Sequence, residues 1–340
     1  MQRLAALIIT ASLFGAGTAL AHEHGHRAPQ TDWSKVEIKT EKVAGSVHML
    51  QGAGGNIGVT SGPDGLLIVD DQYAPVAEKI RAALKQLNSG RLKFVLNTHW
   101  HGDHTGGNAA FGRESTIIAH ENVRKRLAVR SRVMGNFVPP SPPEALPVVT
   151  FDESVRLHFN GEQINVVHFP AGHTDGDSII FFTGSNVIHM GDHFFTGRFP
   201  FVDLENGGSV EGLTRNVAEV IAKAPAGVKF IPGHGPVSTV EDLKTYHGML
   251  VETTAIVRAA IKAGKTVEQV KAEGLPEKWK EWGTGFIKTD RWLETIYQSL
   301  TRDGEKRAAA LLGVRDFQEA VFARPAARAE FKVRRIDEEL

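Results

Sequence analysis

Apolar residues recur along most of the chain with strand-like or helix-like spacing, separated by short polar or glycine-rich stretches. Short apolar runs bounded by glycine, proline or asparagine predict β-strands. In the first half of the chain these runs cover residues 36–38, 47–50, 56–60, 66–70, 94–96 and 116–119. In the second half they cover residues 155–159, 164–169, 178–182, 187–190 and 229–231. The pattern therefore predicts two strand-rich halves.

Apolar residues three and four positions apart predict helices between and after these strands. The predicted helices cover residues 75–87, 121–133, 210–222, 243–263, 267–273 and 290–300, and a further helix with a charged tail is expected in the last forty residues. Five prolines between Pro139 and Pro147 predict a loop, as do the glycine and aromatic residues from Phe194 to Gly208. Strands followed by helices indicate an α/β protein with helix-covered sheets.

The first residues have the pattern of an export signal. A basic start precedes an apolar run over residues 4–18, and Ala19-Leu20-Ala21 is a small-x-small cleavage pattern. We expect a signal peptide over residues 1–21 that is cleaved before His22, a periplasmic or secreted protein, and no stable membrane anchor after cleavage. An uncleaved anchor is the alternative. Residues 22–34 are expected to be a flexible terminus, whose histidines (His22, His24 and His26) either capture a metal weakly or are simply solvated.

The amino-acid composition excludes several classes of protein and several kinds of metal site. Of 340 residues, 41% are hydrophobic and 23% are charged, so the chain has enough hydrophobic residues to form a large core. Lys+Arg and Asp+Glu both number 39, so the basic excess of a nucleic-acid-binding protein is missing. The chain has no cysteine, which excludes disulfides, iron–sulfur clusters, thiolate metal sites and a cysteine nucleophile. Any transition metal must therefore be held by imidazole and carboxylate groups.

Such groups gather directly after predicted strands. Three histidines and an aspartate lie between Thr98 and His104, and three further candidates each follow a glycine at the end of another strand. Imidazole and carboxylate together suit zinc, with iron or manganese as alternatives. The repeated placement predicts one metal site. Its candidate ligands are His99, His101, Asp103, His104, His173, Asp192 and His234.

The ordered motifs His-x-His-x-Asp-His, Gly-His-Thr, Gly-Asp and Gly-His-Gly resemble the signature of the metallo-β-lactamase superfamily of hydrolases. The resemblance implies an αββα sandwich of two mixed β-sheets flanked by helices over residues 35–245, followed by a helical extension over residues 246–340. It also implies two zinc ions per chain. His99, His101 and His173 would bind the first ion, Asp103, His104 and His234 the second, and Asp192 would bridge them.

The residue at position 192 bears on the activity. Zinc β-lactamases that use a cysteine ligand have it where Asp192 stands, and Asp192 instead resembles the bridging aspartate of glyoxalase II and of related lactonases and esterases. The resemblance implies a dinuclear hydrolase whose metal-bridging hydroxide, oriented by Asp103, attacks the ester, thioester, lactone or lactam carbonyl of a small molecule. A true metallo-β-lactamase and a mononuclear iron redox enzyme remain the alternatives.

The substrate side of the site is less clearly predicted. Phe194 either lines an apolar pocket or belongs to the core, and His193 either faces the site or packs behind it. Arg198 is a candidate for binding an anionic group. The aromatic residues of the C-terminal helices either complete a substrate rim or stabilise a helical cap or dimer contact. Candidate hydrogen-bond partners of the metal ligands are Thr98, Asn108, Thr174 and Asp175.

Overall fold

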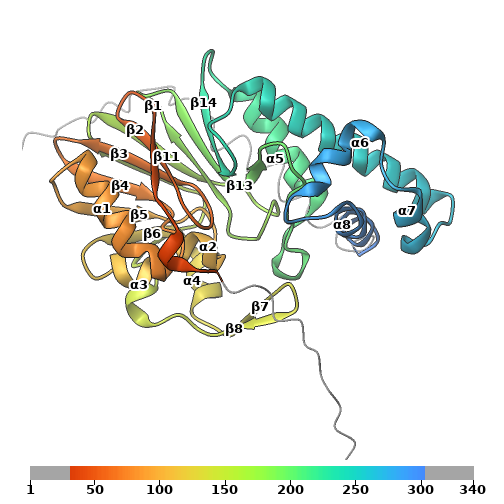
Figure 1. Cartoon of the computed structure of the whole chain (residues 1–340), viewed down its shortest axis with the longest axis horizontal. Helices are drawn as coiled ribbons and strands as arrows, with labels where there is room; N and C mark the ends of the chain where they lie inside the picture. Colours follow the sequence, from red (N-terminus) through yellow and green to blue (C-terminus); the bar gives the residue numbers. More distant parts are fainter. Residues whose placement is uncertain (1–30, 303–340) are drawn as a thin grey trace, which may run out of the picture.

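The computed structural model describes residues 31–302, so the predicted signal segment, the histidines of the first thirty residues and the tail beyond residue 302 lie outside the described residues. Most strands form two sheets (Figure 1). The larger sheet has the order β1 (Lys39–Ala44), β2 (Val47–Gln51), β3 (Ile57–Gly62), β4 (Gly65–Val69), β5 (Leu92–Leu96), β6 (Thr116–His120), β9 (Val149–Phe151). The smaller has the order β10 (Ser154–Phe159), β11 (Glu162–His168), β12 (Ser178–Phe182), β13 (Val187–Phe195), β14 (Lys229–His234).

Both sheets are mixed. Strands β1 to β4 are antiparallel, whereas β4, β5, β6 and β9 run parallel. Strands β10 to β13 are antiparallel, and β14 runs parallel to β13. Apolar side chains from the facing surfaces, such as Leu67 and Val69 of β4 and Ile164 and Val166 of β11, form the core between the sheets. The predicted pair of mixed sheets is confirmed.

Helices cover the outer face of each sheet (Figure 1). Helix α1 (Ala77–Leu87) buries Ile80 and Leu84 against the larger sheet. The smaller sheet is covered by α5 (Val210–Lys223), α6 (Val240–Lys262) and α8 (Thr289–Thr301), beside α7 (Val267–Glu273). The layer order is therefore αββα, as predicted. The shorter helices are α2 (Gly102–Thr105), α3 (Asn108–Phe111), α4 (Glu121–Leu127), η1 (Trp33–Lys35), η2 (Ala74–Val76), η3 (Pro143–Ala145), η4 (Leu204–Asn206) and η5 (Glu277–Thr284).

The C-terminal helices share a core with the sandwich. Phe194 of β13, Tyr246 of α6 and Trp292 of α8 are fully buried in one hydrophobic cluster. The boundary expected at residues 245 and 246 falls inside α6, and the division into two parts stays a prediction. In the described part of the chain, no helix combines the length and the apolar character needed to cross a membrane.

Two predicted elements are wrong. The first strand begins at Lys39 rather than over residues 36–38. The helix predicted over residues 121–133 ends at Leu127, and a two-stranded hairpin follows, made of β7 (Ser131–Val133) and β8 (Asn136–Val138). The hairpin turn consists of Met134 and Gly135, which both have positive φ, at 50° and 78°. Positive φ at both turn residues matches the twist of paired strands and is incompatible with a helix.

Candidate metal centre

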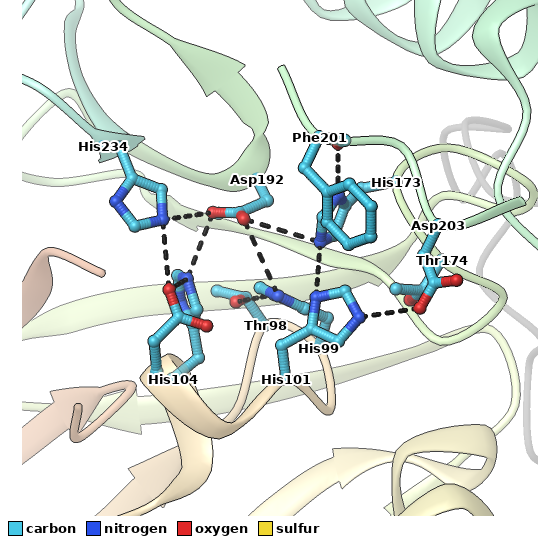
Figure 2. Close-up of polar contacts among 12 residues, drawn as sticks. Thr98, His99, His101, His104, His173, Thr174, Asp192, Phe201, Asp203 and His234 are labelled. Atoms are coloured by element: carbon cyan, nitrogen blue, oxygen red, sulfur yellow. Dashed lines mark hydrogen bonds and ion pairs between the residues drawn. The ribbon is translucent and has the colours of Figure 1, made fainter. Parts of the chain in front are cut away.

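Seven side chains from four separate segments of the chain meet at one edge of the sandwich (Figure 2). They are His99 and His101 after β5, Asp103 and His104 on α2, His173 after β11, Asp192 in β13 and His234 at the end of β14. Three overlapping triplets each have ligand atoms within 4.8 Å of one another. They are His99, His101 and His173; His99, His104 and Asp192; and Asp103, His104 and His234. The structure thus brings together every residue predicted as a ligand.

The carboxylate of Asp192 lies between two groups of side chains. Its Oδ2 is 3.4 Å from His173 Nε2 and 3.8 Å from His99 Nε2. Its Oδ1 is 3.1 Å from His104 Nε2 and 3.5 Å from His234 Nε2. Asp103 completes the second side, with Oδ2 3.3 Å from His234 Nε2. We call His99, His101 and His173 the first ligand group, and Asp103, His104 and His234 the second.

One short segment fixes two imidazoles of the first ligand group. His173 Nδ1 donates to the carbonyl oxygen of Phe201 at 2.7 Å. His101 Nε2 donates to the Oδ2 of Asp203 at 2.8 Å. A neutral imidazole that donates from one nitrogen carries a lone pair on the other. The lone-pair nitrogens here are His173 Nε2 and His101 Nδ1, and they face each other at 2.8 Å.

Asp70 fixes two more imidazoles from the opposite side. This fully buried carboxylate accepts hydrogen bonds from the backbone and hydroxyl of Thr98, and from His104 Nδ1, each at 2.7 Å. The Thr98 hydroxyl donates to Asp70, so it accepts from His99 Nδ1 at 3.0 Å. The Nε2 atoms of His99 and His104 are thereby left as acceptors.

These unpaired atoms fit a metal centre. His99 Nε2, His104 Nε2 and Asp192 Oδ1 are buried and have no hydrogen-bond partner. Buried polar atoms without partners are costly, and lone pairs that face one another repel. A cation among these atoms removes both costs. The ligand groups on offer are neutral imidazoles and carboxylates, a set that suits zinc, iron or manganese.

The two groups differ in electrostatics. Burial lowers the pKa of His173 to about 4 and that of His99 well below its usual value. Burial also opposes charge on His234, yet the carboxylates of Asp192 and Asp103 raise its pKa to about 9. Nearby carboxylates likewise raise the pKa of His104 well above its usual value despite burial. The second group therefore attracts positive charge more strongly than the first.

Two of the three substrate-side candidates, His193 and Phe194, lie in the core and not at the site. Strand β13 continues through Phe195, and all nine of its residues are buried, so His193 and Phe194 are strand residues and not part of a loop. His193 packs behind the site, with Nε2 3.1 Å from the amide nitrogen of Asn216, and burial lowers its pKa to about 3. Phe194 packs against Tyr246 in the core. Both are corrected to core residues, whereas Arg198 is half-buried and its role stays a prediction.

Two carboxylates that hold the ligands were missed. Asp70 follows β4 directly, in the same position relative to a strand as the predicted ligands, and this placement was the available signal. Asp203 lies in the predicted aromatic loop and carries no local motif. Of the four partners predicted for the ligands, Thr98 contacts one through its side chain. The side chains of Asn108, Thr174 and Asp175 bond Asn97, Asp177 and Arg126 instead.

The sequence is similar to a known family of proteins and to individual curated relatives. The family profile described as Metallo-beta-lactamase superfamily matches residues 50–273. A hydroxyacylglutathione hydrolase of Nitrosococcus oceani is 27% identical over 164 residues, which cover 47% of this chain and 55% of the relative. A hydroxyacylglutathione hydrolase of a Polaromonas species matches to the same extent. The chain thus spans about half the length of these curated relatives.

Solved structures share the fold at low sequence identity. A metallo-beta-lactamase from Pontibacter korlensis has a TM-score of 0.53 and 17% identity, over 63% of this chain and 99% of its own. The sec-alkylsulfatase Pisa1 from a Pseudomonas species has a TM-score of 0.60 and 14% identity, over 81% of this chain and 52% of its own. At these identities the likeness concerns the fold alone.

Proposed function

Because the chain belongs to the metallo-beta-lactamase superfamily, we propose that it is a dinuclear metal-dependent hydrolase of small molecules. The observation that carries the proposal is the carboxylate of Asp192, whose two oxygens face different ligand groups. One ion would be held by His99, His101 and His173, and the other by Asp103, His104 and His234. Zinc is the proposed metal, with iron or manganese as alternatives.

Two such ions, when bound, would polarise a substrate carbonyl and make water reactive near neutral pH. The protein itself would orient the reactants. Asp103 is the more accessible of the two carboxylates in the cluster, with 24% of its side chain exposed against 5% for Asp192. Hydrolysis requires a base that takes a proton from the attacking water and an acid that returns it to the leaving atom. The carboxylate of Asp103 is placed to accept that proton.

The proposed substrate class is an ester or thioester, with lactones and lactams as further members. The hydroxyacylglutathione hydrolases among the relatives favour a thioester. Asp192 stands where cysteine-type zinc β-lactamases have their thiolate ligand, which argues against that branch. A true metallo-β-lactamase of another branch and a mononuclear iron redox enzyme are the competing proposals.

A substrate panel with metal analysis tests the proposal. The zinc-loaded protein would be assayed with an acylglutathione, a lactone, an aryl ester, nitrocefin and a secondary alkyl sulfate. We expect two ions per chain, preferred turnover of the thioester or esters, and loss of one ion in His234→Ala. A single ion at saturation, unchanged by His234→Ala, would refute the dinuclear centre. The alkyl sulfate as the best substrate would refute the proposed substrate class, and nitrocefin as the best substrate would refute the proposed preference for a thioester or ester.

We further propose that the protein is exported and begins at His22, on the basis of the apolar segment and the Ala19-Leu20-Ala21 pattern. Expression in a bacterial host, fractionation and N-terminal sequencing test this. Periplasmic or secreted protein that begins at His22 is the expected result. Membrane-bound protein that retains Met1 would mean that the segment is an anchor.

A further inference from the structure

The β7–β8 hairpin has an inner and an outer face. Val133 points inward and packs against the small cluster around Trp100. Side chains alternate along a strand, so Arg132 and its register partner Phe137 occupy the other face. Phe137 is 60% exposed, although this face points to solvent and alternation favours a polar residue there. The outer face therefore presents an aromatic ring that the fold does not need for its own core.

Two more apolar side chains are exposed in the same segment as Phe137. Val129, just before the hairpin, is 55% exposed, and Met134 in the turn is 38% exposed. Isolated exposed apolar residues are common on protein surfaces. Here three of them lie within nine consecutive residues of one small element. Figure 1 shows this hairpin at the periphery of the molecule, away from both sheets.

The same face is positively charged. The guanidinium carbons of Arg130 and Arg132 lie 3.9 and 4.8 Å from the centre of the Phe137 ring. Neither arginine has an ion-pair partner among residues 31–302, and both are exposed. Residues 124–137 contain five Lys or Arg and no Asp or Glu. Lys125 pairs with Glu121 and Arg126 with Asp175, so the excess charge of the hairpin comes from Arg130 and Arg132. The hairpin thus combines exposed apolar groups with locally uncompensated positive charge.

A groove next to the turn adds to this charge. It has a volume of about 90 Å³ and lies between the turn, the 201–205 segment and α8. Arg291 of α8 and Arg302, which directly follows α8, line it together with Met134. Arg291 pairs with Glu294 at 3.2 Å, and Glu205 is the exposed acidic residue of the lining. The groove offers arginine side chains to an anionic group of limited size.

We propose that the outer face of this hairpin (Val129, Arg130, Arg132, Met134 and Phe137) docks reversibly on an anionic phospholipid bilayer. Arginines would pair with lipid phosphates while Phe137, Val129 and Met134 enter the interfacial region. A protein partner fits less well, because a stable protein interface takes about 20–30 residues on each side and this face has five. A bilayer surface requires no matching shape. The proposal is independent of the reaction proposed above.

Docking would place the metal centre close to the bilayer. The backbone carbonyl of Arg132 accepts a hydrogen bond from Asn206 Nδ2 at 2.7 Å. The same Nδ2 donates to Asp203, which holds His101. The hairpin is therefore attached to the segment that orients the first ligand group.

Vesicle co-sedimentation tests the proposal. All variants would carry the same N-terminus, verified by mass spectrometry, so that the apolar segment over residues 4–18 contributes equally. We expect binding to phosphatidylglycerol–phosphatidylcholine vesicles, little binding to phosphatidylcholine alone, and weaker binding in about 0.5 M NaCl. Each arginine near an anionic surface contributes about 5-fold to partitioning, so Arg130→Glu with Arg132→Glu should reduce binding at least about 25-fold. Phe137→Ser should also weaken binding.

Matched variants distinguish this surface from general effects. Lys39→Glu with Lys229→Glu makes the same change in net charge at exposed positions elsewhere, and Phe286→Ser removes a ring that is 73% exposed. Both controls should bind vesicles like the unaltered protein. The proposal is refuted if the unaltered protein does not bind, if phosphatidylcholine binds equally well, or if the controls lose as much binding as the hairpin variants. Self-association that Phe137→Ser abolishes, without vesicle binding, would assign the face to a second copy of the chain and also refute it.

Discussion

At the residue scale, the metal centre depends on which atom each imidazole leaves free. Four histidines use one ring nitrogen as a donor to a fixed acceptor, and the other nitrogen then points to the middle of the cluster. The acceptors are one backbone carbonyl, one hydroxyl and the carboxylates of Asp70 and Asp203. A carboxylate partner also makes the imidazole a stronger ligand, because it stabilises positive charge on the ring. These acceptors therefore control metal affinity without touching the metal.

Asp203→Asn should weaken metal binding at the first ligand group. An amide carries no charge and can turn its NH₂ toward His101 Nε2, which removes the acceptor that fixes the tautomer. Affinity for the more weakly held ion should fall about 10- to 100-fold, as measured by competition with a chromogenic chelator. Glu205→Gln is the control, since this exposed carboxylate lies two residues away and does not contact a ligand. Equal affinities for Asp203→Asn and the control would exclude a positioning role.

Asp192→Asn should reduce the number of bound ions from two to one. The substitution removes one negative charge and one of two equivalent oxygens, so the ligand groups lose their shared carboxylate. Elemental analysis after zinc saturation measures the effect. Turnover should fall by at least about 10- to 100-fold. Retention of both ions with full turnover would show that Asp192 is not a bridge.

The candidate ligands could be found from the sequence because they carry local signals: three histidines and an aspartate clustered after one strand, and a histidine or aspartate that follows a glycine at three other strand ends. Their supporting residues could not be found in this way. Asp70 meets His104 across 34 positions and Asp203 meets His101 across 102 positions. The first contact depends on the pairing of β4 with β5 and the second on how the two sheets pack, and spacing along the chain reveals neither.

At the scale of elements, a histidine pair joins the two sheets at the ends of β6 and β11. His120 ends β6 and His168 ends β11, and their rings stack at 3.7 Å with an angle of 11°. His120 Nδ1 accepts from the backbone of Asn122 while its Nε2 donates to the carbonyl of Asp152. His168 Nδ1 donates to the carbonyl of Asp177 at 2.7 Å. His120 is neutral in this arrangement, because a second proton would remove its Nδ1 as an acceptor, and burial keeps His168 neutral by lowering its pKa to about 4.

Stability should therefore fall as pH falls from about 6.5 to 4. Burial lowers the pKa of His168 from 6.5 to about 4, so in this range the unfolded chain binds the proton and the folded one does not. The shift corresponds to a loss of about 2 kcal/mol in the free energy of unfolding between pH 7 and pH 5. Urea unfolding at both values measures the loss, and His168→Gln should reduce it.

The matched control for this effect is His158→Gln, which replaces an exposed histidine on β10. It should leave the pH dependence of the unaltered protein unchanged. Because acid also releases metal, both variants are compared with the unaltered protein at equal zinc content. An identical pH dependence in His168→Gln and His158→Gln would rule out the pair as a source of acid sensitivity.

The region after α4 shows why elements are predicted less reliably than motifs. Val123, Leu127 and Val133 all pack against the cluster around Trp100, so apolar spacing continues through the end of the helix. The spacing alone therefore predicted a helix to residue 133. The hairpin forms because Met134 and Gly135 adopt a two-residue turn, a local preference that the apolar pattern does not record.

At the scale of the whole molecule, alternating strand and helix periods predicted sheets covered by helices, and the resemblance of the motifs to the metallo-β-lactamase superfamily implied the αββα layering. The relation of the C-terminal helices to the sandwich was not. Their aromatic residues were open to two interpretations, a substrate rim or a cap. Trp292 is fully buried, stacks on Phe199 at 5.8 Å and donates from Nε1 to Thr253 at 3.1 Å. The helices thus complete the core of the smaller sheet, which also carries Asp192 and His234.

This shared core predicts that sandwich and C-terminal helices unfold together. Trp292→Ala should lower the free energy of unfolding by about 3–5 kcal/mol, since it removes a large buried side chain. Circular dichroism and metal release, followed in the same urea titration, should shift together and coincide. Phe286→Ala is the control, because this exposed ring precedes α8 and should have little effect. The contrary outcome is that the variant loses helical signal at low urea while it releases metal at the same urea concentration as the unaltered protein. The C-terminal helices would then form a separate unit, and their packing would not support the metal centre.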